Sequence, residues 1–198
     1  MGERPPTLTA VRRARRGRVE LEVDGIRWRV VPDEVVLRCG LASGVELDRP
    51  LLRALRRELR RAEALGLAVR TVARRDVSTG RLRKTLLSRG VRAEVVEGAV
   101  ETLTSAGIVD DARTAGSRAR WLADRGWGDA AVSARLAGEG FRASDVHAAV
   151  AALRPERERA EALAERAGDP RAAWKLLARR GFAEETVEDV VGPLDADR

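Results

Sequence analysis

Apolar and polar residues alternate along residues 18–30 of the chain, in the pattern of half-buried β-strands. Residues 7–13 are a candidate first strand, Arg18–Val23 follows this two-residue period, and Asp24-Gly25 is a strong hairpin signal. The alternation resumes at Ile26, Trp28 and Val30. We predict a small antiparallel sheet with Trp28 on its buried face.

The apolar spacing becomes helical after this region. Asp33–Cys39 fits a short helix that ends at Gly40, because glycine adopts the left-handed backbone of a helix end without strain. Asp48 and Pro50 are typical of the first positions of a longer helix. Its apolar stripe comprises Leu51, Leu55, Leu59 and Ala62, and its other face carries Arg53, Arg56, Arg57, Arg60 and Arg61.

Three copies of one apolar pattern fill the rest of the chain. When Gly90, Gly140 and Gly181 are aligned, each has a leucine four positions earlier, an apolar residue directly after it, and further apolar residues at fixed spacings. The matched columns are Leu86, Leu136 and Leu177; Val91, Phe141 and Phe182; Val96, Val146 and Val187; Val100, Val150 and Val191; and Leu103, Leu153 and Leu194. This agreement indicates an internal repeat.

Each copy is interpreted as a three-helix unit. A helix ends at the glycine, the next apolar residue folds back onto it, and a second helix buries the valines and the leucine. A further helix precedes each pair, at about residues 65–75, 111–125 and 156–167, and Asp169-Pro170 begins the middle helix of the third copy. We predict repeats at residues 63–108, 109–153 and 154–198, after an N-terminal sheet-and-helix part at residues 1–62.

The predicted fold is therefore mainly α-helical. Units of about 40–50 residues bury little surface alone and gain stability by packing on their neighbours. We expect tandem three-helix repeats in an elongated, curved array, preceded by a small antiparallel β-sheet with helices.

The second and third repeats carry motifs that can be compared with known proteins. Residues 106–113, with the sequence AGIVDDAR, are followed by LAGEGF at 136–141, and the third repeat has LARRGF at 177–182. These segments resemble the Gly-(Leu/Ile)-(Ile/Leu)-Asp-Asp-x-Arg and Leu-x-x-(Arg/Lys)-Gly-Phe motifs of the RecX family of RecA regulators. Residues 23–25 through 40–47 are similar to the N-terminal extension of longer members, so the resemblance covers nearly the whole chain.

Two positions depart from the family pattern. Thr114 stands where the family usually has phenylalanine, and the segment Gly126-Trp127-Gly128-Asp129 stands where basic residues are common. These changes concern which residues of the second repeat touch a partner, and they leave the predicted fold unchanged.

The resemblance implies a regulator that binds RecA and lies along the groove of its filament on DNA. There it would inhibit ATP hydrolysis, strand exchange and filament growth, and so modulate DNA repair and the SOS response.

Charge is unevenly distributed along the chain. The net charge is +7, and of the 38 basic residues only Lys84 and Lys175 are lysines. Arginine suits phosphate contacts, but a high arginine and alanine content is also typical of a GC-rich genome. The four predicted segments carry +6, +3, 0 and −2. We therefore expect an anionic partner nearer the N-terminal half.

Three groups of basic residues are candidate contacts to nucleic acid or to the RecA filament. They are Arg12, Arg13, Arg15, Arg16, Arg18, Arg27 and Arg29 around the first turn and one sheet face; Arg74, Arg75, Arg81, Arg83, Lys84 and Arg89 in the first repeat; and Arg179 and Arg180 in the third. Such contacts would be to phosphates, and hence independent of sequence and sensitive to salt. The arginine stripe of residues 53–61 is either a solvated helix face or a further contact.

No group of residues suggests catalysis, a metal or a cofactor. Asp110-Asp111 is more typical of a helix cap, with Arg113 as ion-pair partner, than of a metal site. His147 is expected on the surface, Cys39 is the only cysteine, and Gly126-Trp127-Gly128 lacks the lysine of a phosphate-binding loop. We therefore predict a non-enzymatic protein.

Two other functional classes stay open. Three-helix units also present recognition helices, so a stand-alone DNA-binding module is the main alternative. A purely protein-binding scaffold is another, and it would show no salt-dependent DNA affinity. We expect a cytoplasmic monomer, because no run of residues is apolar enough for a signal sequence or a membrane span.

Overall fold

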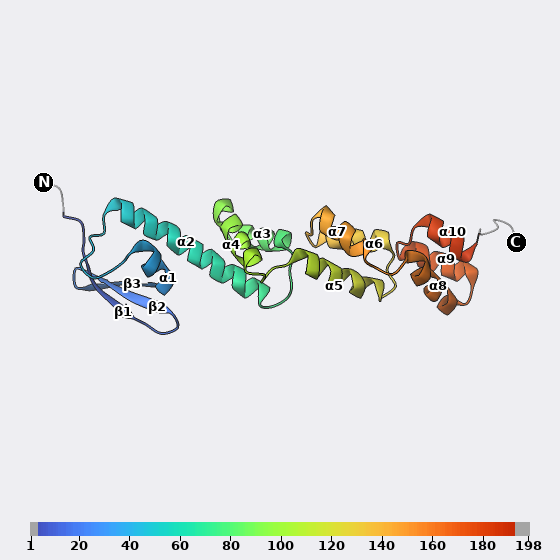
Figure 1. The fold of residues 1–198 in the computed structure, drawn as a ribbon, viewed down its shortest axis with the longest axis horizontal. Helices are drawn as coiled ribbons and strands as arrows, with labels where there is room; N and C mark the ends of the chain where they lie inside the picture. The colour runs from blue at the N-terminus through green and yellow to red at the C-terminus, as the bar shows by residue number, and fades with distance from the viewer. Residues whose placement is uncertain (1–3, 193–198) are drawn as a thin grey trace. The chain divides into compact units, whose positions relative to one another are not determined.

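The computed structural model describes residues 4–192 (Figure 1). Three strands are followed by ten helices within this range. The strands are β1 (Leu8–Arg13), β2 (Arg18–Val23) and β3 (Ile26–Pro32). The helices are α1 (Asp33–Cys39), α2 (Arg49–Val72), α3 (Thr79–Ser88), α4 (Ala93–Ser105), α5 (Asp111–Ala123), α6 (Asp129–Gly138), α7 (Ala143–Ala151), α8 (Glu156–Ala167), α9 (Pro170–Arg179) and α10 (Glu184–Val191). The prediction of a mainly helical fold with a small N-terminal antiparallel sheet is confirmed.

The chain forms two compact units. The first takes in residues up to 70 together with 86–101, and the second takes in 71–85 together with residues from 102 onward. The predicted division at residues 62, 108 and 153 stays a prediction.

The first unit is built on the sheet, in the order β1-β2-β3 with both pairs antiparallel. Val19 and Leu21 of β2 are buried, as their alternation predicts. They share a core with Val31, with Val35 of α1 and with Leu55 of α2. The predicted apolar stripe of α2 is therefore the face that covers this core.

The prediction that Trp28 is buried is wrong. Leu21 pairs with Arg29 and Glu22 pairs with Arg27, so β3 has one extra residue at Trp28. Such a bulge reverses the face on which the following side chains lie. Trp28 is the extra residue and is 40% exposed, and beyond the bulge Val31 takes the buried position instead of Val30.

The predicted separate helix at residues 65–75 is also wrong. α2 runs without a break from Arg49 to Val72, so the predicted boundary between residues 62 and 63 lies inside it. The residues around this boundary are good helix formers, and Ala64 and Ala68 continue the buried stripe. Asp48 begins the helix as predicted, since its carboxylate accepts a hydrogen bond from the Leu51 amide at 2.8 Å.

The repeated glycines end their helices as predicted. Gly90, Gly140 and Gly181 have φ of 79°, 87° and 74°. In each copy the residue after the glycine donates its amide to the carbonyl of the leucine five positions before that residue: Val91 to Leu86 at 3.1 Å, Phe141 to Leu136 at 3.3 Å, and Phe182 to Leu177 at 3.2 Å. This is the Schellman helix end, in which those two residues also make an apolar contact. The Leu-x-x-x-Gly-apolar motif thus encodes one local structure three times.

The second unit contains two complete three-helix clusters (Figure 1). Helices α5, α6 and α7 share one apolar core, and α8, α9 and α10 share another. Leu136 and Leu177 are fully buried in these cores. Leu194, the last position of the repeated pattern, lies outside the described residues.

Candidate nucleic-acid interface and the joints between helices

The start of α3 is fastened to the second helical cluster. The Asp111 carboxylate at the start of α5 accepts hydrogen bonds from the Thr79 amide at 2.8 Å and the Thr79 hydroxyl at 2.7 Å. The Ser78 hydroxyl donates to the Glu139 carbonyl at 2.6 Å. An added Cβ on Gly80 would lie closer than 3.0 Å to the Gly140 carbonyl oxygen. We call this set of contacts the first joint.

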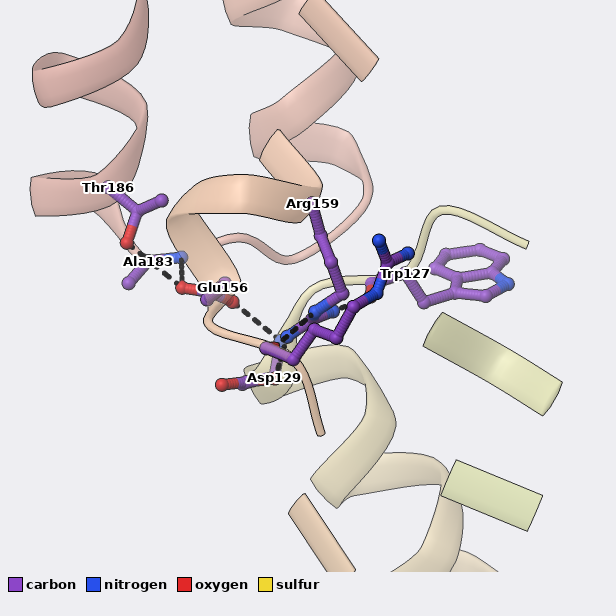
Figure 2. Close-up of polar contacts among 7 residues, drawn as sticks. Trp127, Asp129, Glu156, Arg159, Ala183 and Thr186 are labelled. Atoms are coloured by element: carbon purple, nitrogen blue, oxygen red, sulfur yellow. Dashed lines mark hydrogen bonds and ion pairs between the residues drawn. The ribbon is translucent and has the colours of Figure 1, made fainter. Parts of the chain in front are cut away.

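The start of α6 is fastened to the third cluster in the same way (Figure 2). The Glu156 carboxylate at the start of α8 accepts hydrogen bonds from the Asp129 amide at 2.6 Å, the Ala183 amide at 3.2 Å and the Thr186 hydroxyl at 3.0 Å. The Gly128 amide donates to the Arg180 carbonyl at 3.0 Å. We call this set of contacts, together with those of Arg159, the second joint.

Arg159 lies at the centre of the second joint (Figure 2). Its side chain is only 4% exposed. It donates to the Arg154 carbonyl at 3.0 Å, to the Trp127 carbonyl at 2.9 Å and to the Asp129 carboxylate. Burial raises the pKa of the Asp129 carboxyl, although the Arg159 guanidinium acts to lower it. Glu156 acts in the same direction as burial, so the Arg159 guanidinium only partly opposes the raised pKa of Asp129.

The two joints follow one rule, which the last copy breaks. In both, an acidic residue at the start of one helix accepts the first amide of an earlier helix, that of Thr79 or Asp129. The corresponding first residue of α9 is Pro170, which has no amide hydrogen, and Asp169 caps its own helix through the Ala172 amide at 2.7 Å. The donor used in each joint is therefore missing from the last copy.

The repeated glycines also differ between copies. An added Cβ on Gly140 or Gly181 would press on the helix start held at the joint, within 3.0 Å of the Arg81 amide or of Ala131. Around Gly90 no atom lies within 4 Å of an added Cβ. Gly140 and Gly181 thus serve both the helix end and close packing.

The residues at the start of α5 show which part of the first joint is predictable from the sequence. Asp110 caps α5 as predicted, accepting the Arg113 amide at 2.9 Å, and its carboxylate lies 3.8 Å from the Arg113 guanidinium. The role of Asp111 in capping α3 was missed, as was the role of Arg159. The available signal was Gly80, which stands near the start of a helix where its backbone angles do not demand glycine.

The predicted N-terminal basic group divides into paired and unpaired arginines. Arg12 pairs with Glu22 at 3.2 Å, and Arg27 pairs with Glu20 at 2.7 Å. Arg18 donates to the Val30 carbonyl at 3.4 Å. The other members at the β1–β2 turn are Arg13, Arg15 and Arg16, which are exposed and form no ion pair with any carboxylate in residues 4–192.

The prediction that Arg27 and Arg29 share one exposed sheet face is wrong. Arg27 pairs across the sheet with Glu22, and Arg29 pairs with Leu21. Consecutive residues of β2 point to opposite faces, so their partners do too. The same bulge that exposes Trp28 separates these two arginines, and the Arg29 guanidinium lies 5.6 Å from the Trp28 ring centre.

The first-repeat basic group lies mostly on the surface. Its exposed members are Arg74, Arg75, Arg81, Lys84 and Arg89. Arg83 is half-buried and donates to the Thr79 hydroxyl at 3.1 Å. Arg75 and Arg81 lie together at a groove beside the first joint.

The third-repeat pair is not one patch. Arg179 is exposed, whereas Arg180 donates to the Arg125 carbonyl at 3.0 Å and lies 4.7 Å from the Trp127 ring centre. Arg135 lies over the same ring at 3.8 Å. Trp127 is therefore half-buried between arginines and packs at the second joint.

The remaining candidate chemistry can be located directly. His147 is exposed on α7. In the part of the chain that the structure describes, no group of three His, Cys, Asp or Glu side chains could hold a metal ion. Over the same residues, every helix is too short or too polar to cross a membrane.

Curated proteins resemble the chain over most of their length. The regulatory protein RecX of Stenotrophomonas maltophilia strain R551-3 is 35% identical over 134 residues, which are 63% of this chain and 80% of that protein. The regulatory protein RecX of Xanthomonas axonopodis pv. citri strain 306 is 33% identical over 134 residues, with the same shares. No family model matches the chain.

Solved structures share the fold. A crystal structure of a regulatory protein RecX matches with a TM-score of 0.80, covering 93% of this chain and 99% of that one, at 21% identity. The crystal structure of RecX from Lactobacillus salivarius matches with a TM-score of 0.61 over 70% of this chain and 98% of that one, at 14% identity. At these identities the likeness supports the fold alone.

Proposed function

The chain belongs to the RecX family of regulatory proteins, and we propose that it binds the RecA filament on DNA and inhibits the ATPase and recombinase activities of RecA. The observation that carries this proposal is the similarity to curated regulatory proteins over 80% of a relative's length. In this proposal the protein acts as a monomer in the cytoplasm, without catalysis or a cofactor, and modulates DNA repair and the SOS response.

The proposal assigns nucleic-acid contacts to the basic N-terminal part. Arg13 at the end of β1 and Arg15 and Arg16 in the turn after it are exposed and have no carboxylate partner in residues 4–192, so their charge is available to phosphates. Arg12 and Arg27 would have to break their ion pairs with Glu22 and Glu20 before they could contact a phosphate. We propose the exposed arginines of the first repeat as further contacts to the filament.

The direct test measures RecA ATPase activity on single-stranded DNA with sub-stoichiometric amounts of this protein. We expect inhibition that deepens with time, because a filament regulator acts on many subunits from few positions. Absence of inhibition, together with absence of binding to filaments by co-sedimentation, would contradict the proposal. Tight binding to a particular duplex sequence with no response to RecA would instead favour the stand-alone DNA-binding module.

A second prediction concerns the β1–β2 turn. The double substitution Arg15→Gln and Arg16→Gln should weaken binding to a fluorescein-labelled single-stranded oligonucleotide. Each lost phosphate contact lowers the slope of log affinity against log salt by about 0.7, so the slope should fall by about 1.4. Fluorescence anisotropy over a series of KCl concentrations gives this slope.

The matched control is Arg142→Gln with Arg166→Gln, which removes the same charge from exposed positions outside the proposed contacts. The control should leave the slope unchanged. Equal effects of the two double substitutions would mean that only net charge matters, and would remove the β1–β2 turn from the proposed interface.

A further inference from the structure

An open groove of about 440 Å³ lies beside the first joint. Its walls come from the segment before α3, from α5 and from the end of α6. Val77 and Phe141 form an apolar floor and are themselves buried, and Trp121 of α5 stands at the wall with 42% of its surface exposed. The groove therefore combines apolar surface with an accessible aromatic side chain.

Trp121 is held between two arginines of its own helix region. The Arg118 guanidinium lies 4.3 Å from the indole ring centre, and that of Arg125 lies 3.6 Å from it. Arg118 precedes Trp121 by about one helical turn and Arg125 follows it by about one turn, so the two cations approach the ring from opposite ends of the helix. Arg118 is fixed further by two hydrogen bonds to Glu139, of 2.9 and 2.8 Å.

The groove carries cationic groups that the fold does not use. Arg75 and Arg81 line it and are exposed, and Arg125 stands over Trp121. None of these three guanidinium groups forms an ion pair with a carboxylate of the described chain. The lining has two carboxylates, of which Glu139 is already engaged by Arg118, so Asp76 alone faces three guanidinium groups. An incoming anion therefore finds unneutralised charge around an apolar floor.

We propose that this groove binds an acidic segment of a protein partner, with an apolar side chain on the floor beside Trp121 and flanking carboxylates on Arg75, Arg81 and Arg125. The inference rests on the proposed function, because the filament would supply the partner. An arginine stacked on an aromatic ring keeps its N–H edges free, and those edges match a carboxylate in a two-point contact. A central aromatic group within a ring of polar contacts is also the usual anatomy of a protein-binding hot spot.

The arrangement favours a protein segment over a nucleic acid. Single-stranded nucleic acids bind by stacking bases on aromatic faces. Here two guanidinium groups already lie within 4.3 Å of the Trp121 ring centre, so they compete with a base for stacking on the indole. Asp76 in the lining repels phosphates and carboxylates alike, but a peptide also has backbone amides that can donate to it, which a phosphate backbone lacks.

The test measures binding of a fluorescein-labelled peptide of eight glutamates with one central leucine to the full-length protein. Arg81→Glu should weaken this binding at least tenfold, because an attraction becomes a repulsion. A glutamate near the start of α3 favours the helix dipole, so the variant should keep its fold. Replacing the peptide's leucine with serine should weaken binding to the wild-type protein about fivefold or more.

The matched control is Arg166→Glu on α8, which is also an exposed arginine and undergoes the same change of charge. It should change the peptide affinity less than twofold. Equal losses from Arg81→Glu and Arg166→Glu, or no peptide binding by the wild-type protein at millimolar concentration, would overturn the proposal. Binding of a labelled oligo(dT) is measured in parallel. If Arg81→Glu lowers the affinity for oligo(dT) more than the affinity for the peptide, the groove is a nucleic-acid site and the proposal is overturned.

RecA ATPase measurements separate this inference from the proposed function. Suppose that the wild-type protein inhibits RecA, that Arg81→Glu inhibits with at least tenfold lower potency, and that Arg166→Glu inhibits as strongly as the wild type. The proposed function and the groove inference are then both supported. If the wild-type protein fails to inhibit RecA, the proposed function fails, and the peptide measurements still decide the chemistry of the groove.

Discussion

Replacing Gly128 with alanine should lower the free energy of unfolding by about 3 kcal/mol, in the upper range for an overpacked position. The new Cβ would lie closer than 3.0 Å to the Gly181 carbonyl and to the Phe182 amide. Both are backbone atoms at a helix end that is itself fixed by a hydrogen bond, so neither can rotate away as a side chain would. The Gly128 backbone angles of −76° and 168° suit any residue, so the loss would come from this collision alone.

Gly138→Ala on the same helix is the control. Gly138 is exposed and helical, and no atom lies within 4 Å of an added Cβ. Alanine there should raise stability by about 0.5–1 kcal/mol, since it limits the unfolded chain more than glycine does. Thermal unfolding followed by circular dichroism should separate the variants, with a fall of about 8 °C for Gly128→Ala. Similar melting temperatures for the two variants would show that the second joint accommodates the added Cβ without a loss of stability.

The features that sequence analysis predicted well are local. The Leu-x-x-x-Gly-apolar motif encodes a helix end within six residues, and its hydrogen bond from Phe141 to Leu136 needs no distant partner. Asp48 and Asp110 cap the helices that follow them for the same reason. Because each signal lies within one helical turn of its effect, the pattern alone suffices.

The features that sequence analysis missed depend on distant residues. The position of Trp28 depends on a one-residue bulge that only the register with β2 reveals. The partner of Asp111 is Thr79, 32 positions away. Arg159 lies two positions from Arg157 in a run of alternating charges, and nothing in that run distinguishes the buried arginine from the exposed one. Aligning the copies could not reveal the joints either, because the residues at corresponding positions differ. The first joint uses a serine and a threonine, and the second uses a glycine and an aspartate.

The candidate binding residues were only partly predictable for a related reason. Composition identifies which parts of the chain are basic, but a guanidinium is available to a partner only if the fold leaves it unpaired. The Arg180 guanidinium donates to a backbone carbonyl and lies over Trp127, whereas Arg13 beside the β1–β2 turn is exposed and forms no ion pair within residues 4–192. Trp121 lacked any sequence signal, because the arginines that hold it are spread over a turn of helix on either side.

Arg159→Met should lower the free energy of unfolding by about 3 kcal/mol, since it leaves buried acceptors without a donor while keeping the side-chain volume. The Trp127 and Arg154 carbonyls and the Asp129 carboxylate would all lose hydrogen bonds. Arg157→Met removes an exposed arginine from the same helix, whose ion pair with Glu161 spans 3.0 Å, and should change stability by less than about 0.5 kcal/mol. Urea unfolding of the two variants measures both values.

The loss in Arg159→Met should also depend on pH, through Asp129. Burial and the nearby Glu156 raise the pKa of this carboxyl, and Arg159 opposes them, so its removal should raise that pKa further. A carboxyl whose pKa is higher in the folded than in the unfolded state favours folding when protonated, and this contribution is lost as the pH rises through the folded pKa. The destabilisation by Arg159→Met should therefore be smaller at pH 4 than at pH 7, and smaller in an Asp129→Asn background at both. If the loss of stability is equal at the two pH values and in the two backgrounds, Arg159 stabilises the fold through its hydrogen bonds to the backbone carbonyls. The Asp129 carboxylate would then make no contribution.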